Sequence, residues 1–327
     1  LWEDAGMHPH GEPRDKGRSA RPTRMRERRE KSRRKVRAAD RVQRVNVAIV
    51  GVQKAATSSL FRMLAEHPQI AGGPGKEMRF FLEGQRDWQE PDYSDYARVA
   101  KNPSVRWAMD ATPAYFYWPA ALQRMRRYDA EMRLVLSVRD PLERGFSQWA
   151  MERQRDPEFP DLREAVREYG LTDLPGPAET EFDAPWSRRL SLFARGRYGA
   201  QLERGLSLFP RDQWLILDFP TLLREPEATM DRITDFLGAH RFTRYPEMRH
   251  NMSTSRDNTG EVPTVEDVER LVESHRDDLE LFTRLSGLDV SHWPTSQVLE
   301  GQLTASACRE RLLAKLGLEA SEPDRRP

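Results

Sequence analysis

Apolar and polar positions alternate along this chain in a way that predicts strands and helices in turn. Short apolar runs, typical of buried strands, occur at 45–50, 106–113, 132–138 and 213–219, and the first of them is rich in β-branched residues. Apolar residues recur at helical spacing from Thr57, over 141–155, over 198–209 and over 220–237. A capping-box pattern at 264–267 begins another helix. Strands that alternate with helices predict an α/β fold, with a parallel sheet covered by helices on both faces.

The remaining segments give weaker patterns. Residues 156–187 are rich in Pro, Gly and acidic residues, which indicates an insertion or lid loop, and 240–263 look irregular. We expect one main domain over 46–295. A basic, disordered arm over 1–45 precedes it, and a weakly specified tail over 296–327 follows it.

Residues suited to binding an anion follow the first strand directly. Gly51 ends the strand, Lys54 comes three residues later, and a helix begins at Thr57. The free N–H groups of a first helical turn and the helix dipole favour a phosphate-like group. Between Lys54 and the helix the chain carries small or hydroxylated residues, namely Ala55, Ala56, Thr57, Ser58 and Ser59. The order differs from the P-loop pattern G-x-x-x-x-G-K-[ST]. The alternative is that these side chains merely cap a helix.

A second anion site is predicted after the third strand. Arg139 follows that strand and Ser147 lies two turns into the next helix, so both can reach one anion. The alternative for Arg139 is a surface ion pair with Asp140 or a neighbouring acid. Lys54, Thr112 and Arg139 each follow a predicted strand. Because ligands of parallel sheets bind beyond the carboxyl ends of the strands, we expect these residues at one edge of the sheet.

These motifs together resemble those of the sulfotransferases that use 3′-phosphoadenosine 5′-phosphosulfate (PAPS). Gly51-x-x-Lys54 and the residues up to Leu60 are similar to the family's 5′-phosphosulfate loop, and Arg139-Asp-Pro with Ser147 is similar to its 3′-phosphate motif. Three further segments resemble the heparan-sulfate-type sulfotransferases and their bacterial relatives: 75–81, 110–116 and 196–198. The resemblance extends from about residue 46 to 293.

The resemblance implies a P-loop-like fold and a role for each matching residue. Lys54 and Glu77 would be catalytic, the latter as general base. The residues implied for donor binding are Gly51, Lys54, Ala55, Ala56, Thr57, Ser58, Ser59, Arg139, Ser147 and Tyr198. Arg79, Thr112 and Tyr115 would face the acceptor. PAPS would be the sulfuryl donor, adenosine 3′,5′-bisphosphate the product, and no metal is expected.

The chain departs from the heparan-sulfate pattern at several points. Ala111 stands where those enzymes carry Lys, and Arg79 where they carry His. Their C-terminal cysteine pair and Lys-Gly-Arg phosphate loop are missing, and 253–256 is a weak substitute for the loop. The resemblance therefore predicts a site for the donor, but it does not predict a surface that binds heparan sulfate.

Charge and composition limit the remaining possibilities. Residues 1–45 hold 15 Lys and Arg against 7 Asp and Glu, whereas the rest holds 38 against 45. The basic arm suits nucleic acid, an anionic membrane or an acidic partner, but a solvated tail is the favoured reading and we expect no nucleic-acid partner. The single Cys308 excludes an internal disulfide and a cysteine zinc cluster. Without a signal peptide or an apolar run of about 18 residues, we expect a cytoplasmic, bacterial protein, unless an N-terminal anchor was removed.

The sequence therefore predicts a sulfotransferase that moves a sulfuryl group to a hydroxyl or amine of a carbohydrate, lipid or small molecule. A P-loop-type nucleotide kinase is the alternative enzyme. A non-enzymatic protein that binds nucleic acid or other anions through the basic arm is the alternative outside enzymes. The acceptor and the oligomeric state are left open by the sequence.

Overall fold

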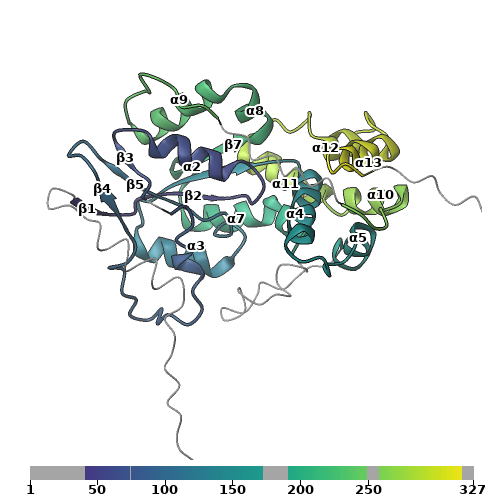
Figure 1. Cartoon of the computed structure of the whole chain (residues 1–327), viewed down its shortest axis with the longest axis horizontal. Helices are drawn as coiled ribbons and strands as arrows, with labels where there is room; N and C mark the ends of the chain where they lie inside the picture. Colours follow the sequence, from purple (N-terminus) through teal and green to yellow (C-terminus); the bar gives the residue numbers. More distant parts are fainter. Residues whose placement is uncertain (1–40, 74, 172–190, 249–257, 319–327) are drawn as a thin grey trace, which may run out of the picture. The chain divides into compact units, whose positions relative to one another are not determined.

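A five-stranded parallel sheet forms the centre of the fold (Figure 1). The computed structural model describes residues 41–73, 75–171, 191–248 and 258–318. The strands, in spatial order, are β3 (Ile70–Ala71), β5 (Trp107–Ala111), β2 (Val47–Gly51), β6 (Arg133–Val138) and β7 (Trp214–Asp218). The apolar runs predicted as strands form β2, β5, β6 and β7, and β3 adds a short edge strand that the sequence did not predict.

Helices cover both faces of this sheet, as Figure 1 shows. One face carries α2 (Thr57–Ala65), α8 (Phe219–Arg224) and α9 (Pro226–Leu237); the other carries α3 (Pro119–Tyr128) and α7 (Tyr198–Leu208), with α11 (Arg276–Ser286) beside α7. Successive side chains of a strand point to opposite faces. Val47 and Ile49 accordingly pack with the first group, and Ala48 and Val50 with the second. The predicted α/β fold with helices on both faces is confirmed.

A separate group of helices packs beside the sheet around its own apolar cluster. Its members are α4 (Pro141–Arg155), α5 (Leu162–Tyr169), α10 (Val265–Glu273), α12 (Pro294–Leu299) and α13 (Ala305–Ala314). Trp149, Val268 and Leu312 are among the buried residues of this cluster. Helix α4 therefore links the end of strand β6 to a second packing centre.

The ends of the predicted domain differ from expectation. Strand β1 (Arg41–Arg44) lies in the segment expected to be disordered and pairs antiparallel with β4 (Ala97–Ala100). Residues after 295, expected to be weakly specified, form most of α12 and all of α13, and Cys308, Leu312 and Leu313 are buried there. Partners distant in sequence order both segments, and a local pattern does not reveal such partners.

Several predicted segments are divided differently in the structure. The segment 156–187 contains α5, which Asp161 caps, while its part from 172 onward lies outside the described residues. The helix predicted over 220–237 is two helices, α8 and α9, because Pro226 has no N–H to continue the first. The helix after Thr264 ends at Glu273 before α11 begins.

Three short 3₁₀ helices complete the described elements: η1 (Phe80–Leu82), η2 (Ala194–Gly196) and η3 (Arg211–Gln213). In 240–263, the described residues 240–248 and 258–263 are irregular, as predicted. Within the described ranges, no helix is long and apolar enough to cross a membrane.

Candidate active site

The loop between β2 and α2 is fixed to the neighbouring strand β6. The amide of Val52 donates to the carbonyl of Ser137 at 2.6 Å, and the Ser137 hydroxyl donates to the carbonyl of Ala55 at 2.8 Å. At Gly51, a Cβ atom would lie 3.0 Å from Cβ of Phe116. The loop therefore passes close to its neighbours and is held by β6 on one side.

The backbone of this loop adopts an uncommon conformation. In the described part of the chain, the non-glycine residues with positive φ are Lys54 (73°), Ala56 (57°) and Arg79 (56°). All three lie in the predicted donor and acceptor motifs. Such conformations cost about 1–3 kcal/mol each and cluster at functional sites. Ala56 is also the N-cap of α2 and has no side-chain oxygen to cap it; the amide of Ser59 donates to the carbonyl of Ala56 at 2.9 Å, and the amides of Thr57 and Ser58 point to a ligand or solvent.

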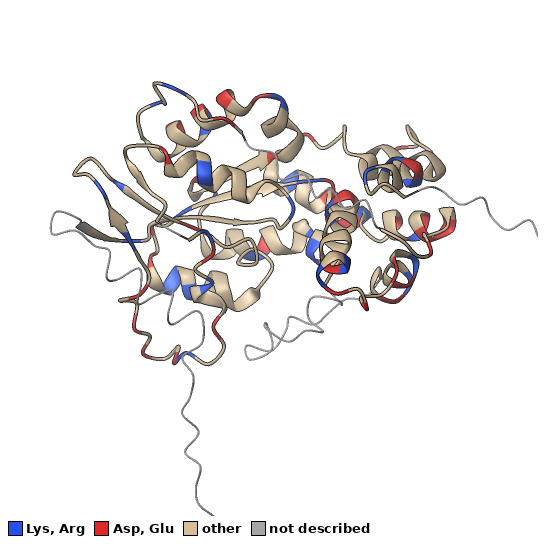
Figure 2. Ribbon diagram, viewed as in Figure 1, with Lys and Arg blue, Asp and Glu red and all other residues tan. Residues whose placement is uncertain are grey.

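Lys54 sits in a strongly positive environment. Its side chain is half-buried, and burial, followed by the charges of Arg139 and Arg155, lowers its pKa from the ordinary value. No carboxylate of the described residues forms an ion pair with it. Figure 2 shows further basic residues along α4, which begins next to this loop. An anion would restore favourable electrostatics at Lys54.

Arg139 follows β6 directly and reaches the loop. Its Nη1 lies 3.5 Å from the carbonyl oxygen of Lys54, while Nε and Nη2 contact Oε2 of Glu143 at 3.0 and 2.9 Å. The structure thus also contains the alternative ion pair, with Glu143 rather than Asp140. Asp140 instead caps α4 by accepting a hydrogen bond from the amide of Glu143. Lys54 and Arg139 are therefore neighbours at the carboxyl ends of β2 and β6.

Two buried side chains lie behind Arg139. Tyr198 has no exposed surface, and its hydroxyl donates to the carbonyl of Arg139 at 2.9 Å. It supports the arginine from inside, whereas the sequence resemblance placed it near the nucleotide. Arg144 is also fully buried; it donates to Gln148 at 2.7 Å and to the carbonyl of Leu192, and burial lowers its pKa to about 10. Ser147 lies one turn further along α4 and is half-buried.

The segment that carries Glu77 is fixed to the end of β5. The amide of Met78 donates to Oδ1 of Asp110 at 3.1 Å, and the amide of Arg79 donates to the hydroxyl of Thr112 at 3.2 Å. The side chain of Glu77 is 41% exposed and pairs with Lys76 at 3.1 Å. The Glu77 segment is thus anchored at the end of β5, which is the direct neighbour of β2, the strand that leads into the Lys54 loop.

Asp110 is the centre of a buried polar network beneath this segment. It accepts hydrogen bonds from the hydroxyls of Tyr115 at 2.8 Å and Tyr96 at 3.2 Å, and faces Arg98 at 3.8 Å. Burial raises the pKa of Asp110, and Arg98 opposes that rise. Thr112 and Tyr115 are 1% and 0% exposed. In this structure, two of the three residues expected to face the acceptor, Thr112 and Tyr115, accept hydrogen bonds from amides of the segment after Glu77.

The sequence of this chain also matches the model of a known protein family. Residues 46–276 match the model of the sulfotransferase domain. The chain belongs to the sulfotransferase domain family. The family and the transferase class predicted from the sequence are thereby confirmed, and the family implies PAPS as the sulfuryl donor.

Relatives of this sulfotransferase domain include two human proteins. Heparan sulfate glucosamine 3-O-sulfotransferase 6 of Homo sapiens is 28% identical over 196 residues, which cover 59% of this chain and 52% of that protein. The bifunctional heparan sulfate N-deacetylase/N-sulfotransferase 3 of Homo sapiens is 28% identical over 211 residues, covering 61% and 23%. The chain thus spans about half, or less, of the length of these relatives.

A solved structure supports the fold of the sulfotransferase domain. The sulfotransferase from Alicyclobacillus acidocaldarius superposes with a TM-score of 0.59 at 24% identity. The superposition covers 77% of this chain and 99% of that one. The similarity therefore extends over most of the fold described above.

The sequence did not predict one contact of the β2–α2 loop in this sulfotransferase domain, between Gln53 of the loop and Arg195. Arg195 is 8% exposed, and its Nη1 lies 3.5 Å from Oε1 of Gln53, while its guanidinium covers the ring of Tyr117 at 4.8 Å. Arg195 and Gln53 are 142 positions apart in the sequence. No local motif marks either residue, so only the fold reveals their contact.

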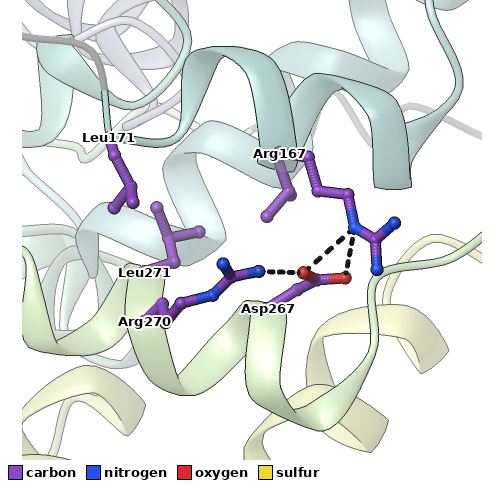
Figure 3. Close-up of a pocket in the computed structure, with 6 residues that line it drawn as sticks. Arg167, Leu171, Asp267, Arg270 and Leu271 are labelled. Carbon is purple, nitrogen blue, oxygen red and sulfur yellow. Dashed lines mark hydrogen bonds and ion pairs between the residues drawn. The ribbon is translucent and has the colours of Figure 1, made fainter.

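A cavity of about 380 Å³ lies between α5 and α10 (Figure 3). Its lining residues are Val166, Arg167, Leu171, Asp267, Arg270 and Leu271. The carboxylate of Asp267 accepts hydrogen bonds from Arg167 at 3.2 Å and Arg270 at 2.6 Å. No predicted site residue lines this cavity, so it is separate from the donor and acceptor motifs.

Proposed function

We propose that this sulfotransferase domain binds PAPS where the β2–α2 loop meets the start of α4, and transfers its sulfuryl group to a hydroxyl or amine. The observation that carries the proposal is the pair Lys54 and Arg139. They are neighbouring cations at the carboxyl ends of adjacent strands, beside an uncapped helix N-terminus. Two such positive groups suit a nucleotide with phosphates at both its 5′ and 3′ positions.

The residues present fit this donor. Lys54 and backbone N–H groups of 55–59 would hold the 5′-phosphosulfate. The amides of Ala55 and Ser59 already donate to the carbonyls of Val52 and Ala56 at 3.3 and 2.9 Å, so those of 56–58 are the ones we assign to it. Among the three hydroxyl residues, Ser58 is half-buried whereas Thr57 and Ser59 are 4% and 5% exposed, so Ser58 offers the most accessible hydroxyl. Arg139 and Ser147 would hold the 3′-phosphate.

The chemistry assigns complementary tasks to Lys54 and Glu77. When bound, the donor supplies a sulfuryl group whose S–O bond to the 5′-phosphate breaks as a bond to the acceptor forms. Lys54 stabilises the negative charge that grows on the leaving oxygen. Glu77 takes the proton of the attacking hydroxyl or amine. The partial exposure of Glu77 and its fixed backbone support this role, because an acceptor can reach the carboxylate from solvent.

The acceptor class stays broad in this proposal: a carbohydrate, a lipid or a small molecule. Two relatives are named for heparan sulfate. This chain carries Arg79 and Ala111 where the heparan-sulfate pattern has His and Lys. Arg79 is half-buried next to Glu77 and is the residue we assign to acceptor contact.

Calorimetric titration with adenosine 3′,5′-bisphosphate tests the donor site. We expect binding without magnesium, strong weakening in Lys54→Ala and Arg139→Ala, and no change in Lys101→Ala, which removes an exposed lysine. Transfer of radiolabelled sulfate from PAPS to a panel of sugars, lipids and phenols then identifies the acceptor. We expect Lys54→Ala to lower turnover about 100-fold or more.

Other outcomes would favour the alternative functions. Magnesium-dependent binding of ATP in place of the bisphosphate would point to a kinase. Salt-dependent binding of an oligonucleotide by the full chain, without affinity for the bisphosphate, would point to the basic arm as the functional element.

A further inference from the structure

A residue after the last described helix contacts the carboxylate that pairs with Arg139 of the predicted 3′-phosphate site. Lys315, at the C-cap of α13, forms an ion pair with Oε1 of Glu143 on α4. The other carboxylate oxygen of Glu143 holds Nε and Nη2 of Arg139. Arg139, Glu143 and Lys315 therefore form a chain of alternating charges. Lys315 lies outside residues 46–276, which match the family model.

Two of these three side chains are largely removed from solvent. The side chains of Arg139 and Glu143 are 14% and 10% exposed, while that of Lys315 is 52% exposed. Burial acts to raise the pKa of Glu143, but Arg139 and Lys315 outweigh it and lower the pKa. Glu143 is thus held as a carboxylate between two cations.

The helices that carry Lys315 are anchored next to the same motif. Oδ2 of Asp140, the residue after Arg139, accepts a hydrogen bond from the amide of Thr295 at 2.8 Å. Leu312 and Leu313 of α13 pack in one cluster with Leu142 and Phe146 of α4. Lys315 consequently approaches Glu143 from a fixed position, and the contact does not depend on a free chain end.

This geometry has an electrostatic consequence for the phosphate site. A carboxylate paired only with Arg139 would cancel the charge that a phosphate needs. Lys315 occupies the second oxygen of Glu143 and leaves the three side chains with a net positive charge. It also fixes the carboxylate, so that Nη1 of Arg139 stays beside the Lys54 carbonyl.

We propose that Lys315 is a positioning residue for the 3′-phosphate of the donor, acting through Glu143 on Arg139. The proposal rests on the donor site proposed above. It adds one residue to that site, Lys315 at the end of α13, which lies outside the residues that match the family model. Its direct consequence is a preference for nucleotides that carry a 3′-phosphate.

The test compares two ligands in the full chain: adenosine 3′,5′-bisphosphate and adenosine 5′-monophosphate, which lacks the 3′-phosphate. Lys315→Met should weaken bisphosphate binding about 3- to 5-fold, the upper size expected for an ion pair with one half-exposed partner. Binding of the monophosphate should stay within about twofold, and Lys315→Arg should restore the bisphosphate affinity. Arg311→Met is the matched control, since it removes one exposed cation from α13, where Arg311 contacts Gln297 and not Glu143.

A double variant tests the route through Glu143. In a Glu143→Gln background, Lys315→Met should cause no further loss of bisphosphate affinity. Three results would overturn the proposal. In the first, Lys315→Met leaves the bisphosphate affinity unchanged, and in the second it weakens the binding of both nucleotides equally. In the third, Lys315→Met weakens bisphosphate binding as much in the Glu143→Gln background as in the unmodified chain. If the unmodified chain shows no preference for the bisphosphate, or Arg139→Ala leaves that preference intact, the donor site itself is wrongly assigned.

Discussion

The backbone amide of Met78 donates a hydrogen bond to the buried carboxylate of Asp110 at 3.1 Å. The bond joins the segment that carries Glu77 to the end of strand β5. The segment that we propose for the acceptor side is therefore positioned by a residue that is fully buried.

Replacing Asp110 should disturb this segment without disturbing donor binding. Asp110→Asn leaves Arg98, which is 6% exposed, without its carboxylate partner, and we expect a loss of about 3 kcal/mol in unfolding free energy. Hydrogen exchange at the amides of Met78 and Arg79 should accelerate, while bisphosphate affinity should stay within about twofold. Asp92→Asn, at an exposed aspartate, is the control and should change stability by less than about 0.5 kcal/mol. Unchanged exchange at Met78 would argue against the anchoring role of Asp110.

Gly51 should not tolerate a side chain. In Gly51→Ala the new Cβ would lie 3.0 Å from Cβ of Phe116 and 3.1 Å from Cδ1 of Leu136, so these buried side chains must give way by a few tenths of an ångström. We expect a loss of about 1–3 kcal/mol in stability, with weaker bisphosphate binding. Gly75→Ala is the matched control, because nothing lies within 4 Å of its added Cβ. Urea denaturation and calorimetric titration measure both effects, and equal behaviour of the two variants would exclude a special role for Gly51.

The lowered pKa of Lys54 predicts an alkaline limit to donor binding. The protonated amine binds an anion, and burial together with Arg139 and Arg155 makes the free site lose its proton below the ordinary lysine value. The Kd for adenosine 3′,5′-bisphosphate should therefore rise as the pH rises through the lowered pKa, by up to about tenfold per pH unit. Lys54→Arg, which stays charged, should lack this limb. Persistence of the limb in Lys54→Arg would assign it to another group.

Buried His275 predicts a loss of stability in weak acid. Burial lowers its pKa to about 4 from 6.5, so between these values the unfolded chain binds more protons than the folded one. Stability should accordingly fall as the pH drops from about 6.5 to about 4, with His275 contributing about 3 kcal/mol. His275→Gln should reduce the slope of unfolding free energy against pH in this window. Parallel slopes for the two proteins would contradict the prediction.

The sequence was informative where the pattern is local. Apolar runs predicted four strands of the sheet, and the order of Gly51, Lys54 and the hydroxyl residues predicted a loop that faces Arg139. Alternation of strand side chains and the chemistry of a helix N-terminus are properties of neighbouring residues, so they are readable without a fold. The convergence of Lys54 and Arg139 followed from one topological rule for parallel sheets.

The features that escaped prediction depend on partners far apart in the chain. Glu143 and Lys315 are 172 positions apart, and nothing near either residue marks the other. Thr112 and Tyr115 belong to a motif expected to face the acceptor, yet Asp110 draws both hydroxyls inward. A motif identifies residues that occur together in a family, but the direction of each side chain depends on buried charges such as Asp110.

The segment that matches the family model ends at residue 276, but the packed structure continues beyond it. The amide of Thr295, for example, donates to Asp140, the residue after Arg139. A fragment stopped at residue 276 would keep every signature motif named above. It would lose the indole of Trp293, which donates to Asp218 at 3.0 Å, the amide of Thr295, which donates to Asp140 at 2.8 Å, and the ammonium of Lys315, which pairs with Glu143. Domain boundaries drawn by similarity alone would thus remove the contacts that support the segment around Arg139.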